Sequence, residues 1–149
     1  MTKRERIAES ILSRGPGKFP ACYELFFSHF NAGEYYEAHD VLEHLWLDST
    51  GPLAQFYKGL IQIAGGFVHL RLQFLRPMHP KDGRRLRPAC RLLVLGSSNI
   101  RPFAPHHLGL DVCALCSLCE HLVHKIESSH FTDNPWNMEV RPQISISAE

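Results

Sequence analysis

The sequence lacks the charge and the leader segment that would place it in several large classes of protein. Its 149 residues carry a formal net charge of only +1, and so weak a charge favours neither nucleic acid nor a membrane surface as a partner. The first ten residues, MTKRERIAES, contain no apolar run of the kind found in a signal peptide. We therefore expect a cytoplasmic protein without a nucleic-acid or membrane partner.

No long apolar run is free of charge. Residues 52–75 are long enough to span a bilayer, but Lys58, His69 and Arg71 would make insertion costly. An amphipathic or wholly apolar helix of this kind belongs in the middle of a domain instead. We expect a buried helix here.

Cysteines are few, five in all, and an odd number. In a cytoplasmic chain they are expected to be reduced. Cys113, Cys116 and Cys119 form C-x-x-C-x-x-C, a spacing that also occurs in iron–sulfur ligation, but the fourth cysteine that would complete such a run is absent. Cys116 and Cys119 continue an apolar line, so we expect them to pack in the core as small hydrophobic residues.

Apolar residues recur at helical spacing along most of the chain. We predict an all-α protein, a single compact helical bundle of five or six helices over residues 1–149, around a central buried helix near residues 52–75. An Asn-Ala-Gly turn at residues 31–33 leads into the helix that carries His39. Further helices are expected at residues 84–97 and 112–128, with a loop at 99–110 between them. From about residue 130 we expect an irregular tail whose Trp136, Val140 and Ile144 lie across the bundle.

His39 and Glu43 are one helical turn apart, on the same face and at the margin of the apolar stripe. Asp40 falls on the opposite, solvent side. A short connection near Thr50 favours antiparallel packing of this helix on residues 52–75, whose one polar line includes Gln62 and His69 beside Gly59, Gly65 and Gly66. Glycine allows a neighbouring helix to approach closely there. Residues predicted to gather in the resulting internal site are His39, Glu43, Trp46, Tyr57 and Gln62, with His69 about 10 Å further along at 1.5 Å per residue.

These residues also form two motifs in a fixed order. The first runs through Phe30-Asn31, Gly33, Tyr35, Glu37-Ala38-His39, Leu42-Glu43 and Trp46, and the second through Tyr57, Gly59-Leu60-Ile61-Gln62, Ala64 and His69. Together they resemble the domain of unknown function 309 family, small all-helical prokaryotic proteins with a His-x-x-x-Glu-x-x-Trp or Tyr pattern suspected of binding a metal. Asp40 stands where that family usually has glutamate. The resemblance implies the fold and a candidate site, not a reaction.

Two hypotheses follow for the function. In the first, His39 and Glu43 bind a divalent metal ion with His69 as a tentative third ligand, and the protein is a metal-dependent hydrolase in which His39 and Glu43 are the candidate catalytic residues. In the second, His39 and Glu43 form a structural hydrogen-bonded network in a non-catalytic helical interaction or scaffold module. Asn31, Trp46, Tyr57 and Gln62 support the site in either case.

Charge is unevenly distributed along the chain. Residues 20–56 contain six acidic residues and no lysine or arginine, whereas residues 71–91 contain seven basic residues and one acid, Asp82. Such a dipolar molecule favours self-association, and we expect a homo-oligomer. The basic cluster around Arg84-Arg85-Leu86-Arg87 carries no interleaved aromatic residues, which argues against nucleic-acid binding.

Overall fold

The computed structural model describes residues 1–147, and six α-helices make up most of this part of the chain. They are α1 (Lys3–Arg14), α2 (Ala21–Asn31), α3 (Tyr35–Trp46), α4 (Gly51–Leu75), α5 (Leu86–Ile100) and α6 (Val112–Ser128). A 3₁₀ turn, η1 (Arg101–Phe103), and a two-residue hairpin of β1 (His106–His107) and β2 (Leu110–Asp111) separate α5 from α6. The predicted all-α bundle around a central helix is confirmed.

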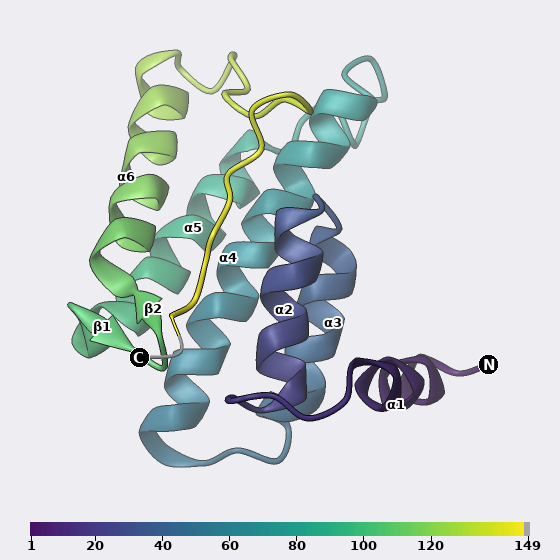
Figure 1. The fold of residues 1–149 in the computed structure, drawn as a ribbon. Coiled ribbons are helices and arrows are strands. Elements are labelled where there is room, and N and C mark those ends of the chain that lie inside the picture. The colour runs from purple at the N-terminus through teal and green to yellow at the C-terminus, as the bar shows by residue number, and fades with distance from the viewer. Residues whose placement is uncertain (148–149) are drawn as a thin grey trace.

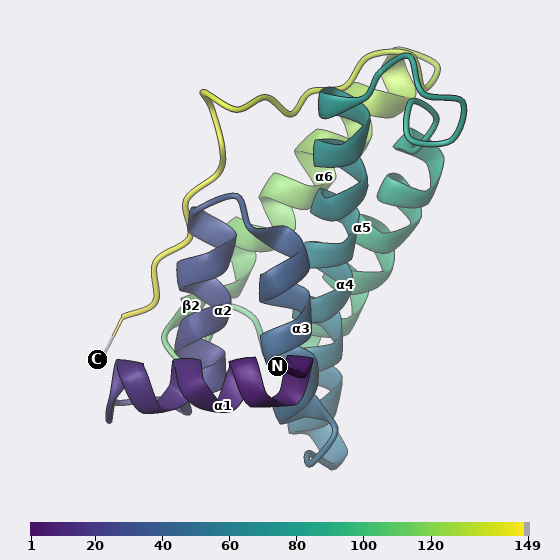
Figure 2. The same cartoon turned by 90° about the vertical axis from the view of Figure 1, so that its right-hand side faces the viewer.

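From α2 to α6 each helix packs on the next one along the chain. Figure 1 shows α4 between the α2–α3 pair on one side and α5 with α6 on the other. Helix α1 stands apart from this arrangement and crosses the lower ends of α2 and α3 (Figure 2). Its capping box at Thr2 and Glu5 starts the helix, but only Ile7 of α1 is buried.

The core centres on α4, which is buried on nearly every face. Ten of its residues are buried, Phe56, Leu60, Ile63 and Phe67 among them. Towards α2 and α3 the core is aromatic: the Phe67 ring lies 5.0 Å from that of Phe30 and 5.1 Å from that of Tyr35. These contacts fix the start of α3 against the middle of α4. Within residues 1–147 no helix is long and apolar enough to cross a membrane.

Glycines bring α4 and α5 into backbone contact. A Cβ added to Gly59 would lie 2.8 Å from the Gly96 carbonyl oxygen, and one added to Gly96 would lie 2.6 Å from that of Gly59. Only two glycines can occupy these facing positions. The close approach predicted from the glycines of α4 is therefore found, and the neighbour is α5.

The C-terminal tail, residues 129–147, runs back along the bundle beside α2 (Figures 1 and 2). Trp136 is buried and donates its Nε1–H to the Tyr35 hydroxyl at 2.9 Å. Asn31 holds the other end, because its Nδ2 donates to the Ile144 carbonyl at 2.8 Å and its Oδ1 accepts from the Ile144 amide at 2.7 Å. Trp136 and Ile144 thus pack as predicted, but Val140 is 72% exposed.

The predicted turn at residues 31–33 is present, but two further local features were not predicted. Asn31 is the last residue of α2 and clamps the tail, so it does more than make the predicted turn. The expected loop at 99–110 contains the end of α5, the 3₁₀ turn and a hairpin whose turn has Gly109 at φ +75°. Asp111 caps α6 by accepting from the Ala114 amide at 2.9 Å, a start that the sequence does indicate.

Candidate functional site

The His39 side chain lies on the surface of α3, beside Asp40 and Tyr36 of the same helix. Its Nδ1 is 3.2 Å from Asp40 Oδ1, its ring stacks on Tyr36 at 6.3 Å between centroids, and its side chain is 33% exposed. Asp40 is not on a solvent side, as the helical spacing suggested, because its side chain is only 17% exposed and faces α1. The imidazole is therefore paired locally within α3.

Glu43 contacts α1. The ammonium of Lys3 lies 3.4 Å from Glu43 Oε1 and 3.6 Å from Asp40 Oδ1. The negative charges of the two carboxylates raise the pKa of Lys3, and Asp40 has the larger effect. The cluster of Lys3, His39, Asp40 and Glu43, which we call the α1 clasp, is what attaches the start of α1 to α3.

The remaining predicted site residues point to other contacts. Gln62 accepts from Asn99 Nδ2 of α5 at 2.7 Å. Tyr57 is buried among aromatic rings, 6.0 Å from that of Tyr23, while Trp46 is partly buried against the core. The glycine-lined, polar side of α4 thus faces α5, whereas α3 packs on the apolar side. The structure does not bring His39 and Glu43 to Gln62.

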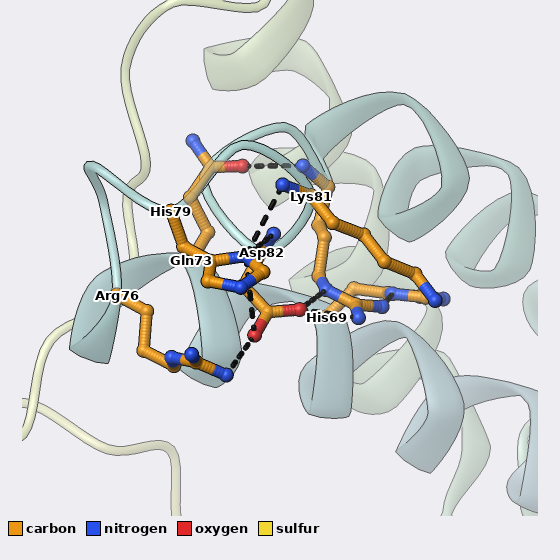
Figure 3. A network of polar contacts seen from close by, with 7 residues as sticks. His69, Gln73, Arg76, His79, Lys81 and Asp82 are labelled. Carbon is orange, nitrogen blue, oxygen red and sulfur yellow. Dashed lines mark hydrogen bonds and ion pairs between the residues drawn. The ribbon is translucent and has the colours of Figure 1, made fainter.

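His69 belongs to a separate polar network between the end of α4 and the start of α5 (Figure 3). Arg85 donates through Nη1 to His69 Nδ1 at 2.9 Å and through Nε to Asp82 Oδ1 at 2.9 Å. Arg76 pairs with the other oxygen of Asp82, and the His79 ring accepts the Asp82 amide at 3.0 Å. These contacts close the 76–85 loop around a carboxylate that is only 5% exposed.

The network sets the protonation of both groups at its centre. Hydrogen bonding by Arg85 lowers the pKa of Asp82, and the charges of Arg85 and Arg76 lower it further. Burial lowers the pKa of His69, and Arg85 acts in the same direction. A guanidinium against His69 Nδ1 would repel a metal ion there. Among residues 1–147 no three His, Cys, Asp or Glu side chains are grouped to hold a metal ion.

A different place on the molecule has the form of a binding site. A cavity of about 290 Å³ lies between the start of α3, the second half of α4 and the C-terminal tail. Residues 32–37 form one side, Val68, Arg71 and Leu72 of α4 the second, and Met138 and Arg141 of the tail the third. We call it the α3 pocket.

Two arginines line the α3 pocket without a partner. In the part of the chain that the structure describes, neither Arg71 nor Arg141 makes a hydrogen bond or an ion pair, and both side chains are only partly exposed. Both guanidiniums act on the Tyr35 hydroxyl and oppose the effect of burial, which raises its pKa. Charged donors of two different segments, α4 and the C-terminal tail, therefore act on one phenol.

Tyr35 adds a buried donor. The residue is 1% exposed, and its hydroxyl oxygen accepts the Trp136 indole N–H. A phenol can also donate one hydrogen bond, and no acceptor for it occurs in residues 1–147. Tyr35, which lines the pocket, thus keeps a hydroxyl group that can still donate one hydrogen bond.

The start of α3 supplies further donors. Its N-cap, Glu34, makes no side-chain capping bond, so the amides of Tyr35, Tyr36 and Glu37 have no partner within residues 1–147. Gly33 gives access to them: it has φ +79°, and a Cβ there would lie 2.9 Å from Arg141 Cδ. A helix N-terminus beside two arginines favours an anion.

Two carboxylates stand at the rim of the α3 pocket. Glu34 is 54% exposed and accepts from His29 Nδ1 at 3.0 Å. Glu37 is exposed and also lines a neighbouring groove with Lys3 and Arg6. The pocket therefore has its cations and donors on the walls and its acids at the rim.

The sequence contains only part of the signal for this pocket. Gly33 after Asn31 marks the turn that exposes the start of α3, and Arg71 stands out as a charge on an apolar helix. Nothing local indicates that Arg141 and Met138, some 70 residues later, return to the same place. That depends on the contacts of Trp136 and Ile144 with α2 and α3.

Fold and site together define an all-α bundle with a charged pocket at a helix N-terminus. Residues 23–78, a little over a third of the chain, match the family described as domain of unknown function (DUF309). The family predicted from the two motifs is thereby confirmed. No curated protein and no solved structure matches the chain significantly.

Proposed function

We propose that this protein binds a small anion in the α3 pocket. One observation carries the proposal: Arg71 and Arg141, which have no partner within residues 1–147, line the same cavity as Tyr35, and both guanidiniums act on its buried hydroxyl. Two guanidinium groups that lie close together in a folded protein repel each other, and an anion bound between them offsets this repulsion. Charge-assisted hydrogen bonds to such an anion are about twice as strong as neutral ones.

The pocket offers several hydrogen-bond donors that suit an anion. Each guanidinium offers a planar set of N–H groups that matches the two oxygens of a carboxylate or phosphate. The amides of Tyr36 and Glu37 add the partial positive charge of the α3 N-terminus. A bound anion would therefore satisfy side-chain and backbone donors at once.

The two functions predicted from the sequence receive unequal support. A divalent ion at His39, Glu43 and His69 lacks a geometric basis, because His69 contacts Arg85 and the other two contact Asp40 and Lys3. The structural-network alternative is supported by the α1 clasp, where an ammonium already lies between two carboxylates. We propose that His39 and Glu43 serve to hold α1, and that binding takes place elsewhere.

Inorganic phosphate is a suitable probe of the α3 pocket. Its effect on the melting temperature is measured at constant ionic strength, set with sodium chloride, so that general screening does not change. Wild type is compared with Arg71→Ala, Arg141→Ala and the double variant. Arg84→Ala is the matched control, since Arg84 is an exposed arginine outside the pocket.

Phosphate should raise the melting temperature of wild type and of Arg84→Ala, because a ligand that binds only the folded state stabilises it. The rise should shrink in each single pocket variant and vanish in the double variant. An equal rise in all five proteins would contradict the proposal, since it would show that phosphate acts without the pocket. No rise in wild type would contradict it as well.

A further inference from the structure

The α3 pocket has an apolar side as well as a charged one. Val68 and Leu72 lie one turn apart on α4 and line it together with Met138 of the tail and Tyr36 of α3. Met138 is 41% exposed and Tyr36 is 65% exposed. A simple inorganic ion would touch the arginines and leave this apolar surface in water.

The size of the pocket also indicates a ligand larger than an inorganic ion. At about 30 Å³ for each water-sized group, a volume of about 290 Å³ has room for roughly ten such groups. A carboxylate occupies about three of them on this scale. About seven apolar atoms could then lie along Val68, Leu72 and Met138.

The charges of the pocket favour a single negative charge on the ligand. Arg71 and Arg141 contribute two positive charges, while Glu34 and Glu37 place two negative charges at the rim. Glu34 is partly balanced by His29, but Glu37 has no ion-pair partner among residues 1–147. A dianion would meet more repulsion from Glu37 than a monoanion would.

From these features we infer that the ligand is an organic monocarboxylate with an apolar body of about five to seven carbons. This inference rests on the proposed function, because it needs an acid group at Arg71 and Arg141. The carboxylate accepts from the guanidiniums and the Tyr35 hydroxyl, and the hydrocarbon packs on Val68, Leu72 and Met138. Arg141 and Met138 line the pocket but lie outside the family-matched residues 23–78.

A series of straight-chain acids tests this directly. Acetate, butyrate, hexanoate and octanoate are titrated into the full chain at constant ionic strength, with hexanol and hexyl phosphate as comparisons. Each CH₂ that becomes buried should tighten binding roughly fourfold. Affinity should therefore rise with chain length from acetate to octanoate, whose seven carbons beyond the carboxylate would fill the cavity, while hexanol, which lacks the acid, should not bind measurably.

A conservative pair of variants locates the apolar contact. Val68→Thr replaces one methyl of the pocket wall by a hydroxyl at nearly constant size and should weaken hexanoate binding severalfold without changing acetate binding. Val94→Thr is the same substitution at an exposed position of α5 outside the pocket, 51% exposed, and should leave both acids unaffected.

The outcomes separate this inference from the proposed function. If phosphate stabilises the protein through Arg71 and Arg141 but hexanoate binds no better than acetate, the inference is wrong and the anion site remains. Tighter binding of hexyl phosphate than of hexanoate would also overturn it, because the charge argument would then fail. If neither phosphate nor any acid binds, both are wrong.

Discussion

Replacing Gly96 by alanine should destabilise the protein, even though alanine favours a helix more than glycine does. In an exposed helix the change would contribute about 1 kcal/mol of stability. Here the new Cβ would lie 2.6 Å from the Gly59 carbonyl oxygen and 3.0 Å from the Ile63 amide nitrogen. Neither backbone atom can rotate away, so α4 and α5 must separate, and overpacking of this kind costs about 1–3 kcal/mol or more.

Because two backbone atoms clash with the new Cβ, we take the overpacking cost as about 2–3 kcal/mol. Subtracting the propensity gain of about 1 kcal/mol leaves a net loss of about 1–2 kcal/mol for Gly96→Ala. At roughly 2–4 °C per kcal/mol for a chain of this size, its melting temperature should fall by about 2–8 °C. Gly65→Ala is the matched control, because its Cβ would meet only the Leu92 Cδ1 atom at 3.1 Å. That flexible side-chain end can move, so the control should melt at the same temperature or slightly higher.

Circular dichroism melts of the two variants and wild type provide the assay, with urea unfolding to obtain free energies. The α4–α5 contact alone predicts that Gly96→Ala lowers the free energy of unfolding whereas Gly65→Ala does not. If Gly96→Ala is as stable as wild type, or if both variants shift equally in one direction, the close backbone approach of α4 and α5 is refuted.

Three further changes test other contacts. Lys3→Ala should cost less than about 1 kcal/mol, and the loss should shrink at high salt; a loss that salt does not alter would contradict the ionic origin of the α1 clasp. The lowered pKa of His69 means that the unfolded chain binds more protons just below pH 6.5, so stability should fall as pH drops from 7 to 5. In urea unfolding, His69→Gln should show a smaller fall, and an identical fall would refute this. Asn31→Ala removes two hydrogen bonds to Ile144, worth about 2 kcal/mol of tail docking, and should speed proteolysis after residue 137; unchanged cleavage would contradict the clamp.

Helix periodicity and local end signals predict most of the fold. The buried helix at residues 52–75 was predicted within one residue of α4, and Asp111 marks the start of α6 because its side chain caps the helix. Pro88 is the third residue of α5 and so lies in its first turn, where the missing N–H removes no hydrogen bond within the helix. Each of these signals depends only on residues that are close in the sequence. Helix positions and helix ends could therefore be predicted from the sequence alone.

The arrangement of helix faces could not be predicted in the same way. Helix α4 is apolar on two sides, so its sequence does not say which side meets α3 and which meets α5. Two sets of contacts orient α4. Gly59 packs against Gly96 of α5, and Phe67 packs on Phe30 and Tyr35 on the other side. Gln62 lies on the same side of α4 as Gly59 and contacts Asn99 of α5. It is therefore not beside His39 and Glu43, as the sequence had suggested.

The candidate site was missed for a related reason. The sequence drew attention to His39 and Glu43 because they share one helix face, yet Lys3 of α1 meets that face. The α3 pocket combines Arg71 with Arg141, which are 70 residues apart. Only the anchoring of the tail by Trp136 and Ile144 brings them together.

An NMR titration with phosphate at constant ionic strength measures the site of anion binding most directly. The backbone amide signals of Tyr35, Tyr36 and Glu37 should shift most, because these N–H groups lack partners and begin the helix at the pocket. The shifts should disappear in the Arg71→Ala/Arg141→Ala variant. Largest shifts in the basic 76–85 loop, with the start of α3 unaffected, would contradict an anion site in the α3 pocket.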